Sequence, residues 1–126
     1  MPKAKLVWKK KPEADDLTAA QTYLSLICSR AKCKKLVGAM EHAKTIEHAA
    51  KDLLRASRLP LLPREEPHVD DDLKKIHKGK PLAPVLLVRG DFAKGIPVVV
   101  ADGYHRICAV YYFDENAPIL CRMAAG

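Results

Sequence analysis

The sequence predicts a single small α+β domain, in which a small mixed sheet is packed against helices. Its 126 residues are 48% hydrophobic, an ordinary fraction for a chain that buries one core. Apolar residues recur at helical spacing through residues 15–57, whereas the runs at 84–89 and 96–100 are rich in Val, Leu and Ile. Helices in the first half and a helix–strand–strand–helix–strand order in the second half indicate the α+β class.

Three amphipathic helices are expected within residues 1–57, a basic N-terminal segment. The third of them starts at Thr45 as its cap and aligns one apolar face: Ile46, Ala49, Ala50, Leu53 and Leu54. These apolar stripes must be buried, so we expect the segment to pack on the core formed by residues 58–126.

A proline-rich connection separates the two halves. Residues 57–67, SRLPLLPREEP, contain three prolines, which end the third helix. We expect an extended segment there, with a short strand at residues 59–62. A helix follows, because Asp70–Asp72 come first, lysines up to Lys78 come last, and Gly79 supplies a C-terminal cap.

The remaining elements follow from the β-branched runs and the turns between them. Residues 84–89 and 96–100 flank the turn GDFAKG and are expected to pair as a hairpin. A helix is expected from Gly103 to about Phe113, and a last strand at residues 119–123.

The net charge of +7 is concentrated in the first half. Residues 1–57 hold 12 Lys and Arg against 6 Asp and Glu, with clusters at Lys9–Lys11 and at Lys32, Lys34 and Lys35. A basic face of this kind can contact DNA or an acidic protein. A solvated helix face is the favoured interpretation, because no aromatic residue or arginine is interleaved with these lysines.

Composition and motifs also exclude several classes. No apolar run approaches the roughly 20 residues that a membrane span needs, and the charged start lacks the apolar core of a secretory signal, so we expect a cytoplasmic protein. The four cysteines contain no C-x-x-C pair and the histidines have no ligand spacing. We therefore expect buried thiols and no metal site.

The stretch VVVADGYHRICAVYYF, residues 98–113, carries the main functional signal. A buried strand gives way to a helix at Gly103, where a backbone without a Cβ allows an anion to come close to the first helical N–H groups. His105 and Arg106 follow in the first turn and could reach the same anion. Asp102 suits the helix cap or the neighbourhood of a metal-bound phosphate. A plain turn beside a solvated charge is the competing interpretation.

The pattern LKKIHKGKPLAPVLLVRG, then VVVADGYHRICAVYY, then APILCRM resembles the ParB/sulfiredoxin-like superfamily over about residues 58–124. The resemblance implies that Gly103, His105 and Arg106 bind nucleotide phosphates, with Asp102 and Tyr104 completing the turn. It places Lys80 near the phosphate as well. Mg²⁺ would accompany a triphosphate.

Two departures limit what the resemblance implies. Tyr104 occupies the position of the catalytic cysteine of sulfiredoxins, so sulfinic-acid repair is not expected. ParB proteins carry a helix-turn-helix region after this module, whereas this sequence stops at Gly126, so DNA recognition of that kind is not expected. Phosphate hydrolysis, phosphate transfer and a non-catalytic module binding DNA or protein through the basic helices all stay open, as does the oligomeric state.

Overall fold

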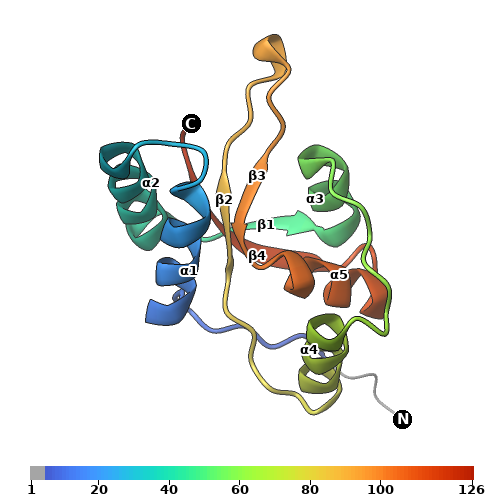
Figure 1. The fold of residues 1–126 in the computed structure, drawn as a ribbon. Coiled ribbons are helices and arrows are strands. Elements are labelled where there is room, and N and C mark those ends of the chain that lie inside the picture. Colours follow the sequence, from blue (N-terminus) through green and yellow to red (C-terminus); the bar gives the residue numbers. More distant parts are fainter. Residues whose placement is uncertain (1–4) are drawn as a thin grey trace.

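The computed structural model describes residues 5–126, so residues 1–4 of the predicted N-terminal segment lie outside it. In this range the chain forms a four-stranded sheet between two groups of helices, which confirms the predicted α+β class (Figure 1). The helices are α1 (Ala14–Leu24), α2 (Arg30–His42), α3 (Ala50–Ser57), α4 (Pro67–His77) and α5 (Tyr104–Phe113). The strands are β1 (Ile46–Ala49), β2 (Val85–Val88), β3 (Val99–Asp102) and β4 (Pro118–Ala124), and a short 3-10 helix, η1 (Phe92–Lys94), lies between β2 and β3.

The sheet is mixed, with the strand order β1-β4-β2-β3. β2 and β3 pair antiparallel, which confirms the predicted hairpin, and its loop projects away from the helices (Figure 1). β4 lies between β1 and β2, antiparallel to the former and parallel to the latter. The last strand of the described chain is therefore a central strand of the sheet.

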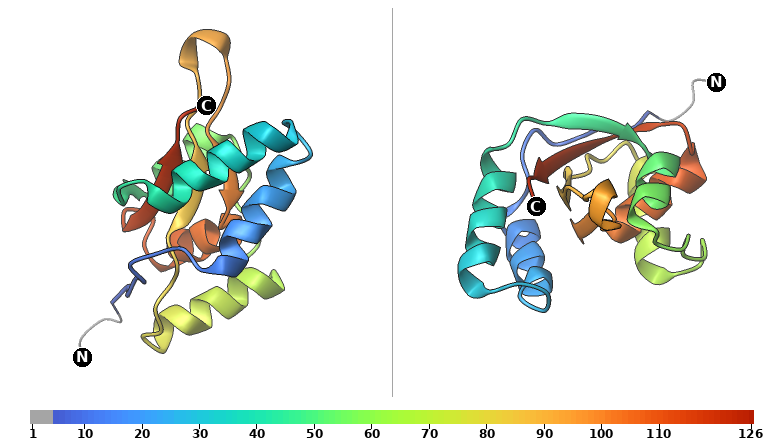
Figure 2. Two further views of the ribbon diagram at one scale, coloured as in Figure 1. Left: turned by 90° about the vertical axis from the view of Figure 1, so that its left-hand side faces the viewer. Right: turned by 90° about the horizontal axis from the view of Figure 1, so that it is seen from above.

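Helices cover both faces of this sheet: α1 and α2 lie on one side, and α3, α4 and α5 lie on the other (Figure 2). β2 is buried on both faces because its four residues are apolar. Leu86 and Val88 contribute to the core under α1 and α2, whereas Val85 and Leu87 contribute to the core under the other three helices. This alternation is the two-residue period of a strand.

Two predicted elements are corrected by the structure. Residues 46–49 form β1 rather than the first turn of the third helix, because they pair with β4, and the helix begins at Ala50. The strand expected at residues 59–62 is not formed, since Pro60 and Pro63 lack N–H donors for a ladder. Two tyrosine hydroxyl groups bond this extended segment instead: Tyr104 donates to the carbonyl of Pro60, and Tyr112 donates to that of Leu62.

A buried arginine ties the N-terminal residues to the centre of the sheet. Arg122 of β4 is only 8% exposed, and its guanidinium donates to the hydroxyl of Thr45 and to the carbonyls of Glu41 and Lys10, at 2.8–2.9 Å. Glu41 lies in the last turn of α2, where the helix dipole is negative and attracts this cation. The contact holds α2 and β1 against β4.

No helix among residues 5–126 has both the length and the apolar character needed to cross a membrane.

Candidate functional site

The junction between β3 and α5 requires glycine at position 103. Gly103 caps α5 with φ of 105°, a left-handed conformation that disfavours other residues. A Cβ at this position would lie 2.9 Å from the Cγ2 atom of Val85 in β2. The strand therefore passes into the helix without an intervening loop, and the first N–H groups of α5 are presented at the end of β3.

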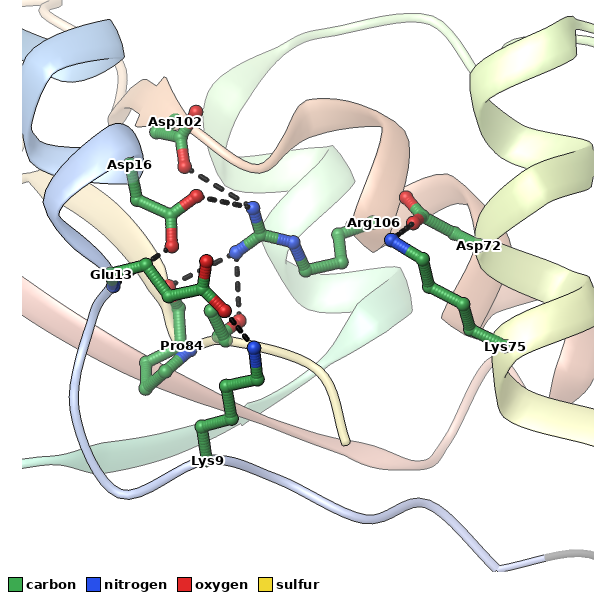
Figure 3. A network of polar contacts seen from close by, with 9 residues as sticks. Lys9, Glu13, Asp16, Asp72, Lys75, Pro84, Asp102 and Arg106 are labelled. Carbon is green, nitrogen blue, oxygen red and sulfur yellow. Dashed lines mark hydrogen bonds and ion pairs between the residues drawn. The ribbon is translucent and has the colours of Figure 1, made fainter. Parts of the chain in front are cut away.

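Arg106, in the first turn of α5, joins three parts of the fold (Figure 3). Its Nη1 atom donates to the carbonyls of Ala83 and Pro84 at 2.7 and 3.1 Å. Its Nη2 atom donates to the carboxylates of Asp16 and Asp102, each at 3.2 Å. The side chain is 14% exposed. The guanidinium is thus engaged by protein groups on both terminal nitrogens.

Of the two carboxylates on Arg106, that of Asp102 is harder to ionise than an exposed aspartate. Burial raises the pKa of Asp102 to about 6, against the attraction of Arg106 and with the help of the neighbouring Asp16 carboxylate. Asp16 also accepts a hydrogen bond from the backbone N–H of Glu13 at 3.1 Å, just before α1. Asp16 therefore fixes both the start of α1 and the position of Arg106.

A cleft of about 290 Å³ opens beside this junction, between the start of α1, the helix α4, residues 81–83 and the start of α5. Gly103, His105 and Arg106 line it. Acidic side chains also line the cleft: Glu13, Asp16, Asp71, Asp72 and Asp102.

The basic groups of the cleft are already paired with these acids. Lys9 forms an ion pair with Glu13, and Lys75 lies 3.8 Å from Asp72 (Figure 3). Burial raises the pKa of Asp72, although the positive charges of Arg106 and Lys75 oppose the shift. Five carboxylates face two lysines, one arginine and two histidines, so the cleft has an excess of negative charge when the carboxylates are ionised and the histidines are neutral.

His105 belongs to a second group at the edge of the cleft. Its Nε2 atom lies 3.7 Å from Oε2 of Glu66, and its ring centroid lies 4.7 Å from that of His68. The Nδ1 atom of His68 lies 3.0 Å from Oε1 of Glu66. This hydrogen bond and the carboxylate charge raise the pKa of His68, even though desolvation opposes the shift. Partial desolvation works against ionisation of Glu66, but the hydrogen bonds from His68 and the backbone of Val69 lower the pKa of Glu66 overall.

The structure brings four of the six predicted site residues to the cleft: Asp102, Gly103, His105 and Arg106. The other two lie elsewhere. Tyr104 reaches back to Pro60 through its hydroxyl, and Lys80 is exposed in the turn after α4. Lys9 and Lys75 supply the lysines of the cleft in place of Lys80.

Several residues of the cleft were missed by the sequence analysis. Asp16 lies 90 positions before Arg106, so no local spacing connects them. Glu66 and His68 did carry a local signal, because a carboxylate and an imidazole two residues apart at a helix start can face the same point. A possible three-ligand site is recognised only in the structure, where α5 places His105 beside Glu66 and His68.

The lysines of α2 are separate from this site. Lys34 and Lys35 are exposed and Lys32 is half-buried, while Cys33, Leu36, Val37 and Met40 bury the opposite face of the helix.

No protein-family model, curated protein or solved structure matches this chain.

Proposed function

We propose that the cleft binds a nucleotide or another phosphorylated small molecule together with a divalent cation. The observation that carries the proposal is the start of α5, where Gly103, His105 and the first helical N–H groups meet a cleft lined by carboxylates. The resemblance of residues 102–106 to the phosphate-binding turn of ParB/sulfiredoxin-like proteins supports the same location.

The anion would be held by the backbone and by His105. The first N–H groups of an α-helix have no partners within the helix, and the dipole makes this end positive. α5 begins at Tyr104 and has 10 residues, enough for both effects. The bare backbone of Gly103 allows a phosphate oxygen to approach.

Arg106 has a different part in this proposal from the one that the resemblance implies. Its terminal nitrogens are bonded to Asp16, Asp102 and two carbonyls, so it holds the turn in place and contributes positive potential. A direct contact between Arg106 and phosphate would first have to break this buried network.

The acidic lining of the cleft is the reason for including a divalent cation in the proposal. A bare phosphate would meet the excess of carboxylates described above, and every lysine in the lining already has an acidic partner. Mg²⁺ prefers carboxylate and phosphate oxygens and would neutralise both. Asp71 and Asp72 are oxygen donors in the lining that do not bond to Arg106.

The test is calorimetric titration of the chain with CTP, ATP, GTP and pyrophosphate, each with and without Mg²⁺. We expect binding that requires Mg²⁺ and that weakens at least about tenfold in His105→Ala and Asp72→Asn, the loss of one charge-assisted contact. Lys80→Ala, outside the cleft, should bind as the wild type does. Failure of all four compounds to bind, or binding unchanged in both cleft variants, would exclude the proposal. Release of inorganic phosphate from a bound nucleotide would show that binding leads to hydrolysis.

A second candidate is a module that binds DNA without catalysis. It is favoured by the exposed Lys34 and Lys35 on the outer face of α2, opposite the face that packs on the sheet. Its test is fluorescence anisotropy with duplex DNA at two salt concentrations. Charge reversal of both lysines should abolish salt-dependent binding, whereas His105→Ala should leave it unchanged.

A further inference from the structure

Glu66, His68 and His105 place three metal-ligating side chains at one point on the edge of the cleft. Glu66 is the N-terminal cap of α4, His68 lies in the first turn of the same helix, and His105 lies in the first turn of α5. We infer that this triad binds one divalent transition-metal ion of the zinc class. The inference does not depend on the proposed phosphate ligand, since the metal alone tests it.

The distances between the ligand atoms of the triad are close to those between the ligands of a bound zinc ion. One oxygen of Glu66 lies 3.0 Å from Nδ1 of His68, and the other lies 3.7 Å from Nε2 of His105. All three ligand atoms lie within 4.8 Å of one another. Ligands about 2.0–2.1 Å from a tetrahedral zinc ion are separated by roughly 3.3 Å. Both contacts are close to this spacing, although they are made by different oxygens of Glu66, so side-chain rotation has to bring one oxygen and the two ring nitrogens around a single ion.

Glu66 of the triad is fixed by the fold, whereas the exposed His68 side chain can rotate. The Oε2 atom of Glu66 accepts a hydrogen bond of 2.9 Å from the backbone N–H of Val69, so the carboxylate is anchored to α4. Val69 and Ile107 are buried in the core beneath α4 and α5, which fixes these helices against each other. His68 is 72% exposed, and a rotation of its side chain moves no buried group.

The kind of metal follows from the donor atoms. Two imidazole nitrogens and one carboxylate oxygen suit zinc, cobalt, nickel or ferrous iron, whereas magnesium and calcium prefer oxygen donors alone. His68 and His105 both line the cleft, so the remaining coordination positions would face it. A water molecule or an oxygen of a cleft ligand can complete the shell, which is the arrangement of an open metal site rather than a closed structural one.

Binding of the ion exchanges a proton for the metal. In the metal-free chain the His68 ring nitrogen and the Glu66 oxygen share a hydrogen bond, and ligation requires that nitrogen to be unprotonated. The metal takes the place of the shared proton, which passes to the solvent. The third ligand, His105, comes from a different helix and distinguishes this triad from an ordinary surface ion pair between Glu66 and His68.

The experiment is zinc titration of the chelator-treated chain by calorimetry, with Co²⁺ absorption as a second readout. We expect one zinc ion per chain and cobalt d–d bands without a thiolate charge-transfer band. His68→Ala should weaken zinc binding at least about tenfold, as should His105→Ala, the scale at which losses around metal sites are measured. His68 is the primary variant because its exposed side chain can be removed without affecting the core.

Two control variants make the result specific. His42→Ala removes an exposed imidazole at the end of α2 and should bind zinc like the wild type. Cys28→Ser tests the other pair of close ligands, since the sulfur atoms of Cys28 and Cys33 lie 3.5 Å apart. The inference is overturned if no stoichiometric zinc binds, if His68→Ala binds zinc unchanged, or if Cys28→Ser is the variant that loses it. Because the titration contains no nucleotide, failure of the proposed phosphate site leaves its outcome unaffected.

Discussion

Asp16 in α1 and Arg106 in α5 are 90 residues apart in the sequence, yet the carboxylate and the guanidinium lie 3.2 Å from each other. Asp102, four residues before Arg106, approaches the same Nη2 atom at the same distance. One arginine thus connects the first helix, the end of β3 and the loop before β2. The stability of the cleft depends on this connection.

Replacement of Arg106 by Ala should lower the free energy of unfolding by about 3–5 kcal/mol, the cost of removing one partner from a buried ion pair. The variant would leave two carboxylates facing each other and two carbonyls without their donor. Urea denaturation followed by circular dichroism measures the change. Lys80→Ala, at an exposed position, should change stability by less than about 0.5 kcal/mol. Equal stabilities for the two variants would contradict the role given to Arg106.

Asp102→Asn should alter how stability depends on pH. The pKa of Asp102 is about 6 in the folded chain and about 3.9 in an unfolded one, so the folded chain holds its proton more tightly. The contribution of Asp102 to stability is therefore greatest below about pH 4 and decreases as the pH rises through about 6.

The difference in unfolding free energy between the wild type and Asp102→Asn reports this effect together with its coupling to Asp16 and Arg106, because the titrating groups that do not contact Asp102 are common to both proteins. We expect the wild type to lose stability relative to the variant between pH 4 and pH 6, with little further change above pH 7. Urea unfolding at intervals of one pH unit gives the curve. A difference that rises with pH in this window would show that the pKa of Asp102 is lowered rather than raised.

Gly103→Ala should destabilise the chain by about 2–4 kcal/mol, combining a left-handed backbone strain with a clash in the core. The added Cβ would lie 2.9 Å from a methyl group of Val85, and φ is 105°. Compared with Val85→Ala alone, which has its own cavity cost, the double variant Gly103→Ala with Val85→Ala should lose only the part due to backbone strain. Gly79→Ala is the matched control for backbone strain alone, because φ is 70° there and an added Cβ meets no atom within 4 Å. Thermal unfolding of the wild type, the two single variants, the double variant and the control separates the two effects.

Oxidised glutathione should convert Cys28 and Cys33 into a disulfide, with the glutathione disulfide reduced to two thiols. The two sulfur atoms are 3.5 Å apart, and Cys28 is partly exposed whereas Cys33, Cys108 and Cys121 are buried. Thiol titration in denaturant should fall from four groups to two, and peptide mapping should place the bond in residues 28–33. Cys28→Ser should keep its three thiols unoxidised. Loss of the Cys108 or Cys121 thiol instead would contradict the geometry.

The elements predicted from sequence are those whose signals are local. The acids, lysines and glycine around residues 66–79 define α4 without reference to the rest of the chain, and the hairpin β2–β3 needs only one turn. β1 was missed because its conformation is set by β4: Ile46 pairs with Cys121, and no neighbouring residue signals that partner. The intrinsic helix pattern of Ile46–Ala50 was overridden by this pairing.

In the candidate site, too, the local features could be predicted from the sequence, whereas the contacts between distant residues could not. The turn at Gly103 was visible in sequence because a strand, a glycine and two basic residues are contiguous. The partners that occupy Arg106 could not be found in this way, since Asp16, Ala83 and Pro84 come from other elements. Histidines 68 and 105 had no ligand spacing in the sequence, yet the packing of α4 against α5 brings their rings to 4.7 Å.

The central position of β4 governs the order in which a growing chain can fold. β1 and β2 both hydrogen-bond to residues 118–124, so neither strand has that partner until the ribosome has released this segment. Until β4 is available, β1 and the β2–β3 hairpin therefore have open strand edges. Edges of that kind attract other chains. Slow translation before residue 118 would lengthen this exposure, whereas a chaperone that covers strand edges would be most useful in the same interval.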